Sequence, residues 1–285
     1  AYQLAIGAGV ESMSQAPMPP PFKPGAPLGS QYSPRELARY QDNPLIPQGT
    51  SSELMNKRFG LTREALDAFA VRSHQRAIAA SQAGRVQDQL VRLNEDPADP
   101  DSPLVTADEG MRADPNPEKM ATLKPVFAAD GATTAANSSQ ISDGAAALLL
   151  ASRAYAKQHG LKPRARFVSS AAAAADPVIQ FTAVLDATRK ALKESGLTLA
   201  DIDLFEVNEA FSGVPLMFQQ EFGIPDDRLN VNGGSVAIGH PLGSTGARIL
   251  TDLLCELERR GGRYGLQTIC EASGTANTTI IERLA

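Results

Sequence analysis

The second half of the chain alternates short apolar stretches with segments of helical periodicity, which predicts a mixed α/β fold. The apolar run 145–151 has the length of a buried strand, and 152–159 has helical spacing and stops at Gly160. Further strands are expected at 167–170, 203–207, 268–270 and 278–282, and further helices at 184–195, 209–222 and 246–260. Because strands alternate with helices, we expect helices packed against the faces of a sheet.

Proline dominates the stretch 13–123 instead. Nine of the 20 prolines lie within 17–47 and six within 97–125, and each proline fixes φ and removes a backbone donor. One helix is predicted inside this stretch, with an N-cap at Thr62 and a stop at Gly84. An irregular segment of this length in a compact protein is usually functional or disordered, and we expect a lid or a ligand-covering insertion.

The first residues, 1–7, have the pattern of a strand that is already under way, with no turn before it. An upstream segment would explain this pattern. An edge strand that simply begins here explains it equally well.

Composition and charge narrow the functional classes. A chain of 285 residues is long enough for two domain-sized units, and its 42% of hydrophobic residues excludes a disordered chain. The net charge of −5 gives no basic footprint for nucleic acid, and no apolar run approaches the roughly 18–20 residues of a membrane helix. Two cysteines cannot form a disulfide framework, and three widely separated histidines indicate no local metal site. We therefore expect no metal, no nucleic-acid partner and no membrane contact, with the cytoplasm as the default location.

A glycine-rich segment, 232–248, carries the strongest catalytic candidate, His240. Glycines let a backbone approach a ligand closely, and a helix N-terminus favours negative charge. Histidine has a pKa suited to proton transfer near neutrality. A lone histidine is more often structural, but in a glycine-rich loop between a strand and a helix we expect His240 to be catalytic.

Two further segments carry candidate residues. Asn208 lies where a strand is expected to give way to a helix, so helix capping and ligand binding explain it equally well. Cys270 ends a strand ahead of a tight turn, which leaves backbone N–H groups available to a ligand. Cys255 lies in an amphipathic helix and is expected to be a small buried apolar side chain.

Together these segments resemble the thiolase family over essentially the whole chain. The matching motifs, in order, are AGVESMS at 8–14, EKMATLKPVF at 118–127, NSSQISDGAAAL at 137–148, VNEAF at 207–211, the His240 loop, the Cys270 segment and IERL at 281–284. The spacings of 32 residues from Asn208 to His240 and 30 from His240 to Cys270 are also similar to those of the family. The NEAF motif and the late cysteine favour a degradative or biosynthetic thiolase over the sterol-carrier branch and over ketosynthases.

The resemblance implies the five-layered αβαβα thiolase fold, built from two similar lobes. The first lobe would be incomplete here, formed by residues 1–12 and 124–162. Residues 13–123 would form a loop domain that covers the CoA site, and residues 163–285 the second lobe. The resemblance also implies a homodimer or homotetramer.

The implied reaction is cleavage of a 3-ketoacyl-CoA by CoA into acetyl-CoA and a shortened acyl-CoA, with coenzyme A as substrate and no cofactor. His240 would be the base for a nucleophilic cysteine, and Cys270 would move a proton to or from the acetyl carbon. His240 and a water held by Asn208 would bind one thioester oxyanion. The backbone N–H of Ala272, with that of the nucleophile, would bind the other.

The nucleophilic cysteine of the family lies upstream of the motif at 8–14, so we expect it outside this chain, on a segment that is cleaved off, disordered, or part of a second polypeptide such as an N-terminal fragment. The resemblance places coenzyme A on five residues: Arg112 near the adenine and phosphates, Ser139 at the pantetheine, and Phe127, Ala135 and Phe211 along the tunnel.

Two departures from the family pattern concern the acyl pocket and the oxyanion turn. PQG at 47–49 replaces HMG, and EASG at 271–274 replaces a glycine-rich run. We therefore expect a different or bulkier acyl group. Two other functions stay open: a non-catalytic CoA-binding or assembly subunit with a thiolase-like shell, and a ketosynthase-like enzyme that would not need Cys270.

Overall fold

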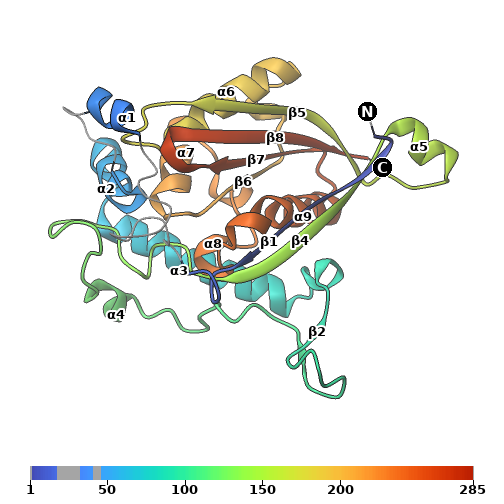
Figure 1. The fold of residues 1–285 in the computed structure, drawn as a ribbon, viewed down its shortest axis with the longest axis horizontal. Coiled ribbons are helices and arrows are strands. Elements are labelled where there is room, and N and C mark those ends of the chain that lie inside the picture. The colour runs from blue at the N-terminus through green and yellow to red at the C-terminus, as the bar shows by residue number, and fades with distance from the viewer. Residues whose placement is uncertain (1, 18–32, 41–45, 285) are drawn as a thin grey trace.

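The computed structural model describes residues 2–17, 33–40 and 46–284 (Figure 1). Its main sheet has four strands in the spatial order β5 (Ala165–Ala174), β8 (Thr275–Arg283), β7 (Tyr264–Cys270) and β6 (Leu204–Val207). β6 and β7 run parallel, and the other neighbours are antiparallel. A second sheet pairs β1 (Leu4–Ser12) with β4 (Asp143–Ala151), and a short hairpin pairs β2 (Leu93–Asn94) with β3 (Leu104–Val105).

The helices lie between and around these sheets. In chain order they are α1 (Pro34–Arg39), α2 (Gln48–Phe59), α3 (Arg63–Gln82), α4 (Pro117–Ala121), α5 (Arg153–Gln158), α6 (Ala183–Ser195), α7 (Gly213–Phe222), α8 (Ser235–Ile238) and α9 (Leu242–Arg260). Short 3-10 turns occur at Gln87–Gln89, Leu199–Asp201, Asp226–Arg228 and Ala272–Gly274. None of the described helices is both long and apolar enough to cross a lipid bilayer.

The layers follow from two amphipathic helices. α6 covers one face of the four-stranded sheet, against β5 and β8. α9 lies on the opposite face and also contacts β1 and β4, so that it is packed between the two sheets (Figure 1). The order is therefore helix, sheet, helix, sheet, which is four of the five layers expected of a thiolase. Among the described residues, nothing covers the outer face of the β1–β4 sheet.

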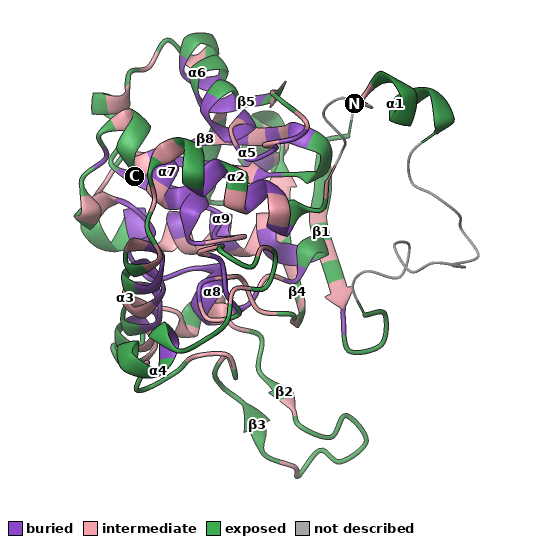
Figure 2. Ribbon diagram, turned by 90° about the vertical axis from the view of Figure 1, so that its left-hand side faces the viewer, coloured by how far each residue is buried: buried purple, intermediate pink, exposed green. Residues whose placement is uncertain are grey.

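That outer face is apolar. Ile6, paired with Leu149, is 71% exposed, and Val10, paired with Ala145, is 72% exposed. Alternate residues of the same strands point to α9 and are less exposed; Figure 2 shows this contrast between β1 and the buried layers beside it. A strand with apolar side chains on both faces is typical of a sheet that is covered on both sides.

Glycine allows the close contact of β1 with α9. A Cβ on Gly9 would overlap the carbonyl of Gly243 in the first turn of α9, and a Cβ on Gly243 would overlap the carbonyl of Val10. Glu11, two residues after Gly9, accepts a hydrogen bond of 3.1 Å from the N–H of Gly243. The glycine of the motif at 8–14 therefore sets how closely the two layers approach.

Most predicted elements are present, with some corrections at their ends. α3 is capped by the Thr62 side chain, as expected, and Gly84 follows it at φ 71°. The predicted helix 209–222 begins only at Gly213, because residues 210–212 pair with residues 137–139. The predicted helix 246–260 begins earlier, at Leu242.

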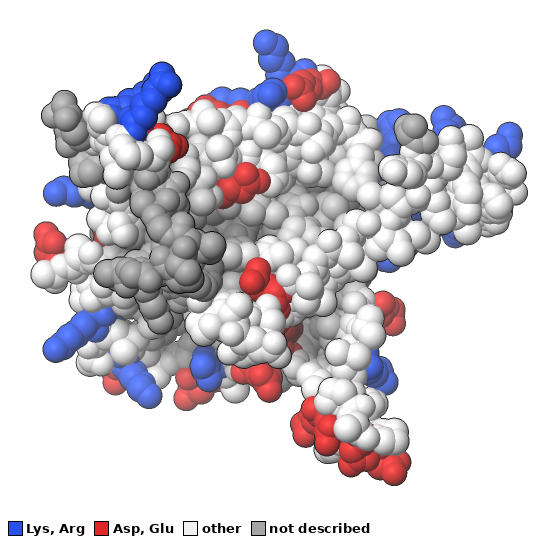
Figure 3. Space-filling view, viewed as in Figure 1, with Lys and Arg blue, Asp and Glu red and all other residues white. Residues whose placement is uncertain are grey.

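The stretch 13–123 contains more structure than predicted. Besides α3 it holds the helices α1, α2 and α4; its proline-rich part at 18–32 lies outside the described residues. The β2–β3 hairpin projects from the body, and its tip gathers acidic side chains in the space-filling view (Figure 3). The same view shows the surface hollowed between the four-stranded sheet and the β1–β4 sheet.

Candidate active site

Two of the predicted site residues follow neighbouring parallel strands. β6 ends at Val207 and β7 ends at Cys270, and Val207 pairs with Thr268. The N–H of Asn208 continues this ladder with a hydrogen bond of 3.0 Å to the carbonyl of Thr268. Because parallel strands end at the same edge of a sheet, Asn208 and Cys270 lie at one edge.

Asn208 does not cap a helix. The helix that follows it, α7, has Ser212 at its N-cap. The Asn208 side chain instead contacts the glycine-rich segment: its Oδ1 accepts a bond of 2.6 Å from Ser235 Oγ, and its Nδ2 lies 3.1 Å from His240 Nε2. Asn208 is 2% exposed, so both contacts are made away from solvent. Of the two explanations for Asn208, the structure excludes capping.

His240 is held from both sides of its ring. Nδ1 lies 2.8 Å from the hydroxyl of Thr245, and this hydroxyl also lies 2.8 Å from the carbonyl of Pro241, which can only accept. The single hydroxyl hydrogen of Thr245 is best used on Pro241, so Nδ1 carries the proton and donates to Thr245. Nε2 is then a bare acceptor toward the Asn208 amide. Burial lowers the pKa of His240 to about 4, so the ring is neutral at physiological pH.

The backbone of His240 is also tethered. Its N–H donates to the carbonyl of Gln140 at 3.2 Å, and the Gln140 amide donates to the carbonyls of Val236 and Gly110 at 2.7 and 2.9 Å. Gly239, immediately before His240, has φ 85°, a value that L side chains rarely adopt. These contacts fix the loop from which the imidazole projects.

Cys270 lies at the end of β7 with its side chain 9% exposed and packed in the main apolar core cluster. Its Sγ has no hydrogen-bond partner among the described residues. Burial raises the pKa of the thiol to about 12, so Cys270 carries a proton at neutral pH. Such a thiol is a proton donor and a poor nucleophile.

The turn after Cys270 exposes Ala272. Glu271 N–H is bonded to the Thr275 carbonyl at 2.9 Å, but the N–H of Ala272 makes no hydrogen bond to another described residue. Ser273 has φ 61°, so the turn keeps its tight shape although serine stands where the family has glycine. Ala272 is exposed two residues after Cys270.

The residues expected at coenzyme A fall into two groups. Phe211 and Ser139 are close to Asn208, because Ser138 bridges to Phe211 and the N–H of Ser139 donates to the Ala210 carbonyl at 3.0 Å. The ring of Phe127 is edge-on to that of Phe211, with centroids 6.0 Å apart. Ala135 is exposed on the adjoining segment.

Arg112 stands farther along the surface. Its side chain is exposed and forms no ion pair among the described residues, and its N–H donates to Nδ1 of His74 at 3.2 Å. The Gln140–Gly110 bond described above links this segment to the His240 loop. Among the described residues, Arg112 makes no hydrogen bond to Asn208, His240 or Cys270.

Sequence reasoning missed Ser235, Thr245 and Gln140, which orient Asn208 and His240. It also missed Phe181, which is fully buried with its ring edge-on to Phe211 at 5.5 Å. Gln140 lies inside the matched motif 137–148, and this position was a usable signal. Phe181 had none, because it meets Phe211 only after the chain has folded.

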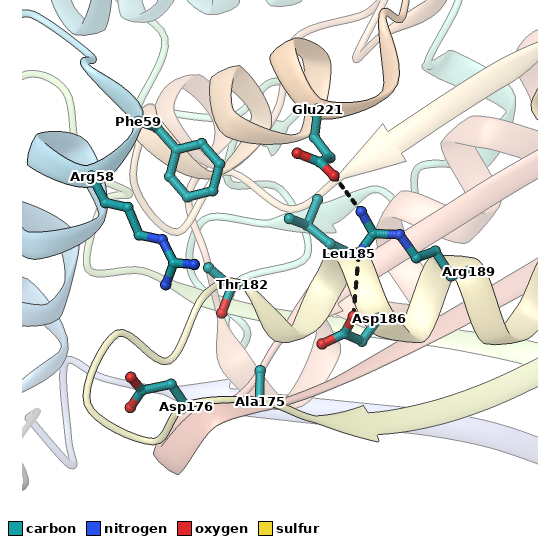
Figure 4. A pocket seen from close by; sticks show the side chains of 9 residues that line it. All are labelled: Arg58, Phe59, Ala175, Asp176, Thr182, Leu185, Asp186, Arg189 and Glu221. Atoms are coloured by element: carbon teal, nitrogen blue, oxygen red, sulfur yellow. Dashed lines mark hydrogen bonds and ion pairs between the residues drawn. The ribbon is translucent and has the colours of Figure 1, made fainter.

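A pocket of about 500 Å³ lies apart from these residues. Figure 4 shows it between α2, α6 and α7, with Arg189 bonded to Asp186 and Glu221. Asn208, His240 and Cys270 do not line it. In the part of the chain that the structure describes, no group of three or more histidine, cysteine or acidic side chains is arranged to hold a metal ion.

Comparisons with known proteins agree with the motifs. The family models "Thiolase, N-terminal domain" and "Thiolase, C-terminal domain" match residues 1–154 and 161–283. A steroid 3-ketoacyl-CoA thiolase of Mycobacterium tuberculosis is 45% identical, and the alignment covers 99% of this chain and 68% of that protein. A peroxisomal 3-ketoacyl-CoA thiolase of Arabidopsis thaliana is 41% identical over 99% of this chain and 61% of its own length.

Solved structures match as well. The human mitochondrial 3-ketoacyl-CoA thiolase in complex with CoA superposes with a TM-score of 0.87 at 33% identity, covering 99% of this chain and 71% of that one. The 285 residues thus span roughly two thirds of the length of these relatives. With two domain models matched end to end and the fold shared, the chain belongs to the thiolase family.

Proposed function

We propose that the protein transfers acyl groups between carbon and coenzyme A, cleaving a 3-ketoacyl-CoA with CoA to acetyl-CoA and a shortened acyl-CoA. The observation that carries this proposal is the contact between Asn208 and His240 at the sheet edge where β7 ends in Cys270. A neutral imidazole acceptor and a protonated thiol at one edge supply the base and the acid that a reversible Claisen cleavage needs.

His240 is the base in this scheme. Its bare Nε2 takes the proton of the attacking thiol, and the Nε2–H that results then donates to the oxyanion on the thioester. The same nitrogen therefore serves first as acceptor and then as donor. The Asn208 amide, which contacts Nε2 without a ligand, turns to the substrate or to a water when one is bound.

Cys270 is the acid toward carbon. Cleavage of the bond between C2 and C3 of the 3-ketoacyl group leaves its electron pair on the acetyl-CoA fragment as an enolate. The Cys270 S–H protonates that carbon. The Cys270 thiolate therefore forms in the same step in which the enolate is protonated. In the condensation direction the same sulfur removes the proton.

Ala272 completes the second oxyanion site. Its N–H, which has no partner among the described residues, is available to the carbonyl oxygen under attack. A preorganised donor of this kind contributes about 3–4 kcal/mol to transition-state stabilisation. In this proposal coenzyme A contacts a row of residues from the reacting carbon outward, and Arg112 binds its phosphates. The row consists of Ser139, Ala135, Phe211 and Phe127.

The acyl-accepting thiol comes from outside residues 1–285. Cys270 is needed as the acid, and Cys255 is in the wrong place. Cys255 lies ten residues beyond Thr245 on α9, which separates it from the His240 contact by about 15 Å along the helix. Its Sγ contacts Arg164 at 3.2 Å instead, and burial raises its pKa.

The uncovered face of β1–β4 supports the same proposal. Further polypeptide packed on Ile6, Val10 and Leu149 would bury this apolar surface and supply the thiol, either as an N-terminal segment or as a separate N-terminal fragment. The same lobe would also carry the dimer or tetramer contact.

The acyl group is bulkier than acetoacetyl in this proposal. Gly49 of the divergent PQG segment lies flat against the ring of Phe127, where a Cβ would overlap it. One of the relatives is named as a steroid 3-ketoacyl-CoA thiolase. Thiolysis rates for short, long and branched 3-ketoacyl-CoAs measure this preference, and a wide lead for acetoacetyl-CoA rejects it.

One experiment tests the function without needing the acyl-accepting thiol. Acetyl-CoA is incubated with the protein in D2O, and loss of the acetyl methyl proton signal is followed by NMR. We expect exchange with the natural chain and with Cys255→Ala, and none with Cys270→Ala. Binding of CoA without any exchange would favour the non-catalytic subunit instead, a function for which the comparisons offer no support. Exchange that survives in Cys270→Ala would favour the ketosynthase-like alternative.

A second measurement locates the thiol. The purified material is treated with a 3-ketoacyl-CoA, digested and mapped by mass spectrometry. We expect the acyl group on a cysteine other than Cys255 and Cys270. Stable acylation of either one contradicts the assignment above.

A further inference from the structure

The turn that follows Cys270 has a backbone shape that its sequence disfavours. Ser273 has φ 61° and ψ 28°, the left-handed region, and Gly274 follows at φ 79°. Glu271, Ala272 and Ser273 are all exposed, so packing does not hold this shape. Another part of the chain must hold it.

Gln180 makes that contact. It is 3% exposed and has φ 59°, so it too is a non-glycine residue in the left-handed region. Its Oε1 accepts a hydrogen bond of 3.1 Å from the N–H of Ser273. Its Nε2 donates to the carbonyl of Ile46 at 3.0 Å and to Ser51 Oγ at 2.9 Å.

The orientation of this amide is determined by its partners. Ser51 Oγ donates its own hydrogen to the carbonyl of Val178 at 2.6 Å, so it accepts from Gln180. The carbonyl of Ile46 can only accept, and the N–H of Ser273 can only donate. If the amide were flipped, its oxygen would face two acceptors, the Ile46 carbonyl and Ser51 Oγ, and its NH2 group would face the N–H donor of Ser273. Oε1 therefore faces the turn.

The loop that carries Gln180 contacts both the pocket of Figure 4 and the Cys270 turn. Ala175, Asp176 and Thr182 line the pocket of Figure 4, so the outer side of this loop borders open space. On the inner side, the N–H of Ala175 donates to the carbonyl of Gly274 at 2.8 Å. Together with the Gln180–Ser273 bond, this gives the turn two hydrogen bonds to one loop.

We propose that Gln180 is a positioning residue that holds the Cys270 turn in register with α2, so that the Ala272 N–H and the Cys270 thiol stay aligned on one substrate. This inference rests on the proposed function, which assigns those two groups to the reaction. Gln180 touches no reacting atom. A misplacement of about 1 Å in such a site can lower the rate about 10²-fold, so a single amide can matter for catalysis.

Three variants separate the parts of this role. Gln180→Gly keeps the left-handed backbone accessible and removes all three side-chain bonds. Gln180→Asn tolerates the same backbone, but its shorter side chain cannot bridge Ser51 and Ser273. The matched control is Gln219→Ala on α7, which also loses a side-chain bond to a carbonyl, that of Ile224 at 3.0 Å, away from the turn.

The first readout is amide hydrogen exchange at Ser273 in the full chain, followed by NMR or by mass spectrometry of the peptide around 271–276. It requires no catalytic activity. We expect exchange at least about tenfold faster in Gln180→Gly and Gln180→Asn and unchanged in Gln219→Ala. An unchanged rate in a folded Gln180 variant overturns the proposal. If Gln180→Gly does not fold, Gln180→Asn alone decides.

The second readout is the deuterium exchange of acetyl-CoA. We expect the maximal rate to fall about 10–100-fold in the Gln180 variants, with the acetyl-CoA concentration for half-maximal rate changed less than about twofold. Unfolded protein would also lower the maximal rate without changing the half-maximal concentration, so each rate is divided by the folded fraction measured by circular dichroism. A merely structural role would leave the rate per folded molecule unchanged, as we expect for Gln219→Ala. If the natural chain shows no exchange at all, the proposed function fails, while the Ser273 measurement still decides on the positioning of the turn.

Discussion

The Nδ2 of Asn208 lies 3.1 Å from the Nε2 of His240, with the opposite ring nitrogen of His240 bound to Thr245. Because Asn208 Oδ1 accepts the hydrogen bond from Ser235 Oγ, the NH2 group of the amide points to the His240 ring. The pair is therefore directional: the neutral imidazole keeps its lone pair toward the sheet edge that carries Cys270. This arrangement favours a base that is ready to accept a proton.

Changing Asn208 should shift the titration of His240. In Asn208→Asp a carboxylate replaces the amide beside Nε2 and favours the imidazolium, so the pKa of His240 should rise from about 4 toward or above its ordinary value. NMR titration of the imidazole protons measures this shift. Asn116→Asp, which adds the same charge at the N-cap of α4, should leave His240 unchanged. Equal titration in both variants would remove the Asn208–His240 contact from the mechanism.

Deuterium exchange of acetyl-CoA should rise steeply with pH. The pKa of Cys270 is raised to about 12, so the thiolate that removes the proton is a small fraction at neutral pH and grows tenfold per pH unit. We expect a slope near ten per unit from about pH 6 to about pH 9, kept in Cys255→Ala. A plateau with a midpoint near about 8.5, the ordinary cysteine value, would mean that the thiol is not desolvated.

Glu206 should destabilise the protein at neutral pH. Burial raises its pKa well above 4.5, and the nearby Asp252, Glu209 and Glu256 add to this effect while Arg76 opposes it. The folded state therefore holds a proton that the unfolded state releases above about pH 4.5, and stability falls as the pH rises. Glu206→Gln should raise the urea midpoint at about pH 8 and change it little at about pH 4.5. A gain that is equal at both pH values contradicts this linkage.

Phe181 should influence which acyl groups the site accepts. Its ring contacts that of Phe211, which in turn contacts that of Phe127, so the three rings form one aromatic cluster. Phe181→Leu should increase the rate for branched or long 3-ketoacyl-CoAs relative to short ones by several-fold. Phe218→Leu, an equally buried phenylalanine that packs on Phe222, serves as the control for lost stability, which is about 1–2 kcal/mol in either variant. The same rate ratio in both variants would exclude Phe181 from the acyl pocket.

Several elements could be predicted from local pattern because local physics determines them. α3 has a side-chain cap at Thr62, and the apolar residues of α6 and α9 recur at helical spacing. α2 escaped prediction because it begins after Pro47 with no side-chain cap and lacks a clear apolar stripe. Its burial comes from contact with α7, which no local pattern records.

The segment 208–212 illustrates where local pattern misleads. Its sequence continues smoothly into a helix, but the Glu209 carboxylate is buried and accepts bonds from Ser73, Asn230 and the N–H of Val236. The N–H of Ser139 donates a hydrogen bond to the carbonyl of Ala210. These long-range partners satisfy the backbone and side chains better than an extra helical turn would, so α7 starts four residues later than Glu209.

The sequence by itself determined the family, most of the strands and helices after residue 143, and the candidates Asn208, His240 and Cys270, because motifs and spacing are local properties of the chain. Only the tertiary structure decided that Asn208 binds His240 instead of capping α7, that Cys270 is a desolvated thiol, and that Gln180 reaches the turn behind it. Those properties depend on burial and on hydrogen bonds between residues that lie 27 to 93 positions apart in the sequence. Such contacts contribute to stability only after the sheets and helices have packed together.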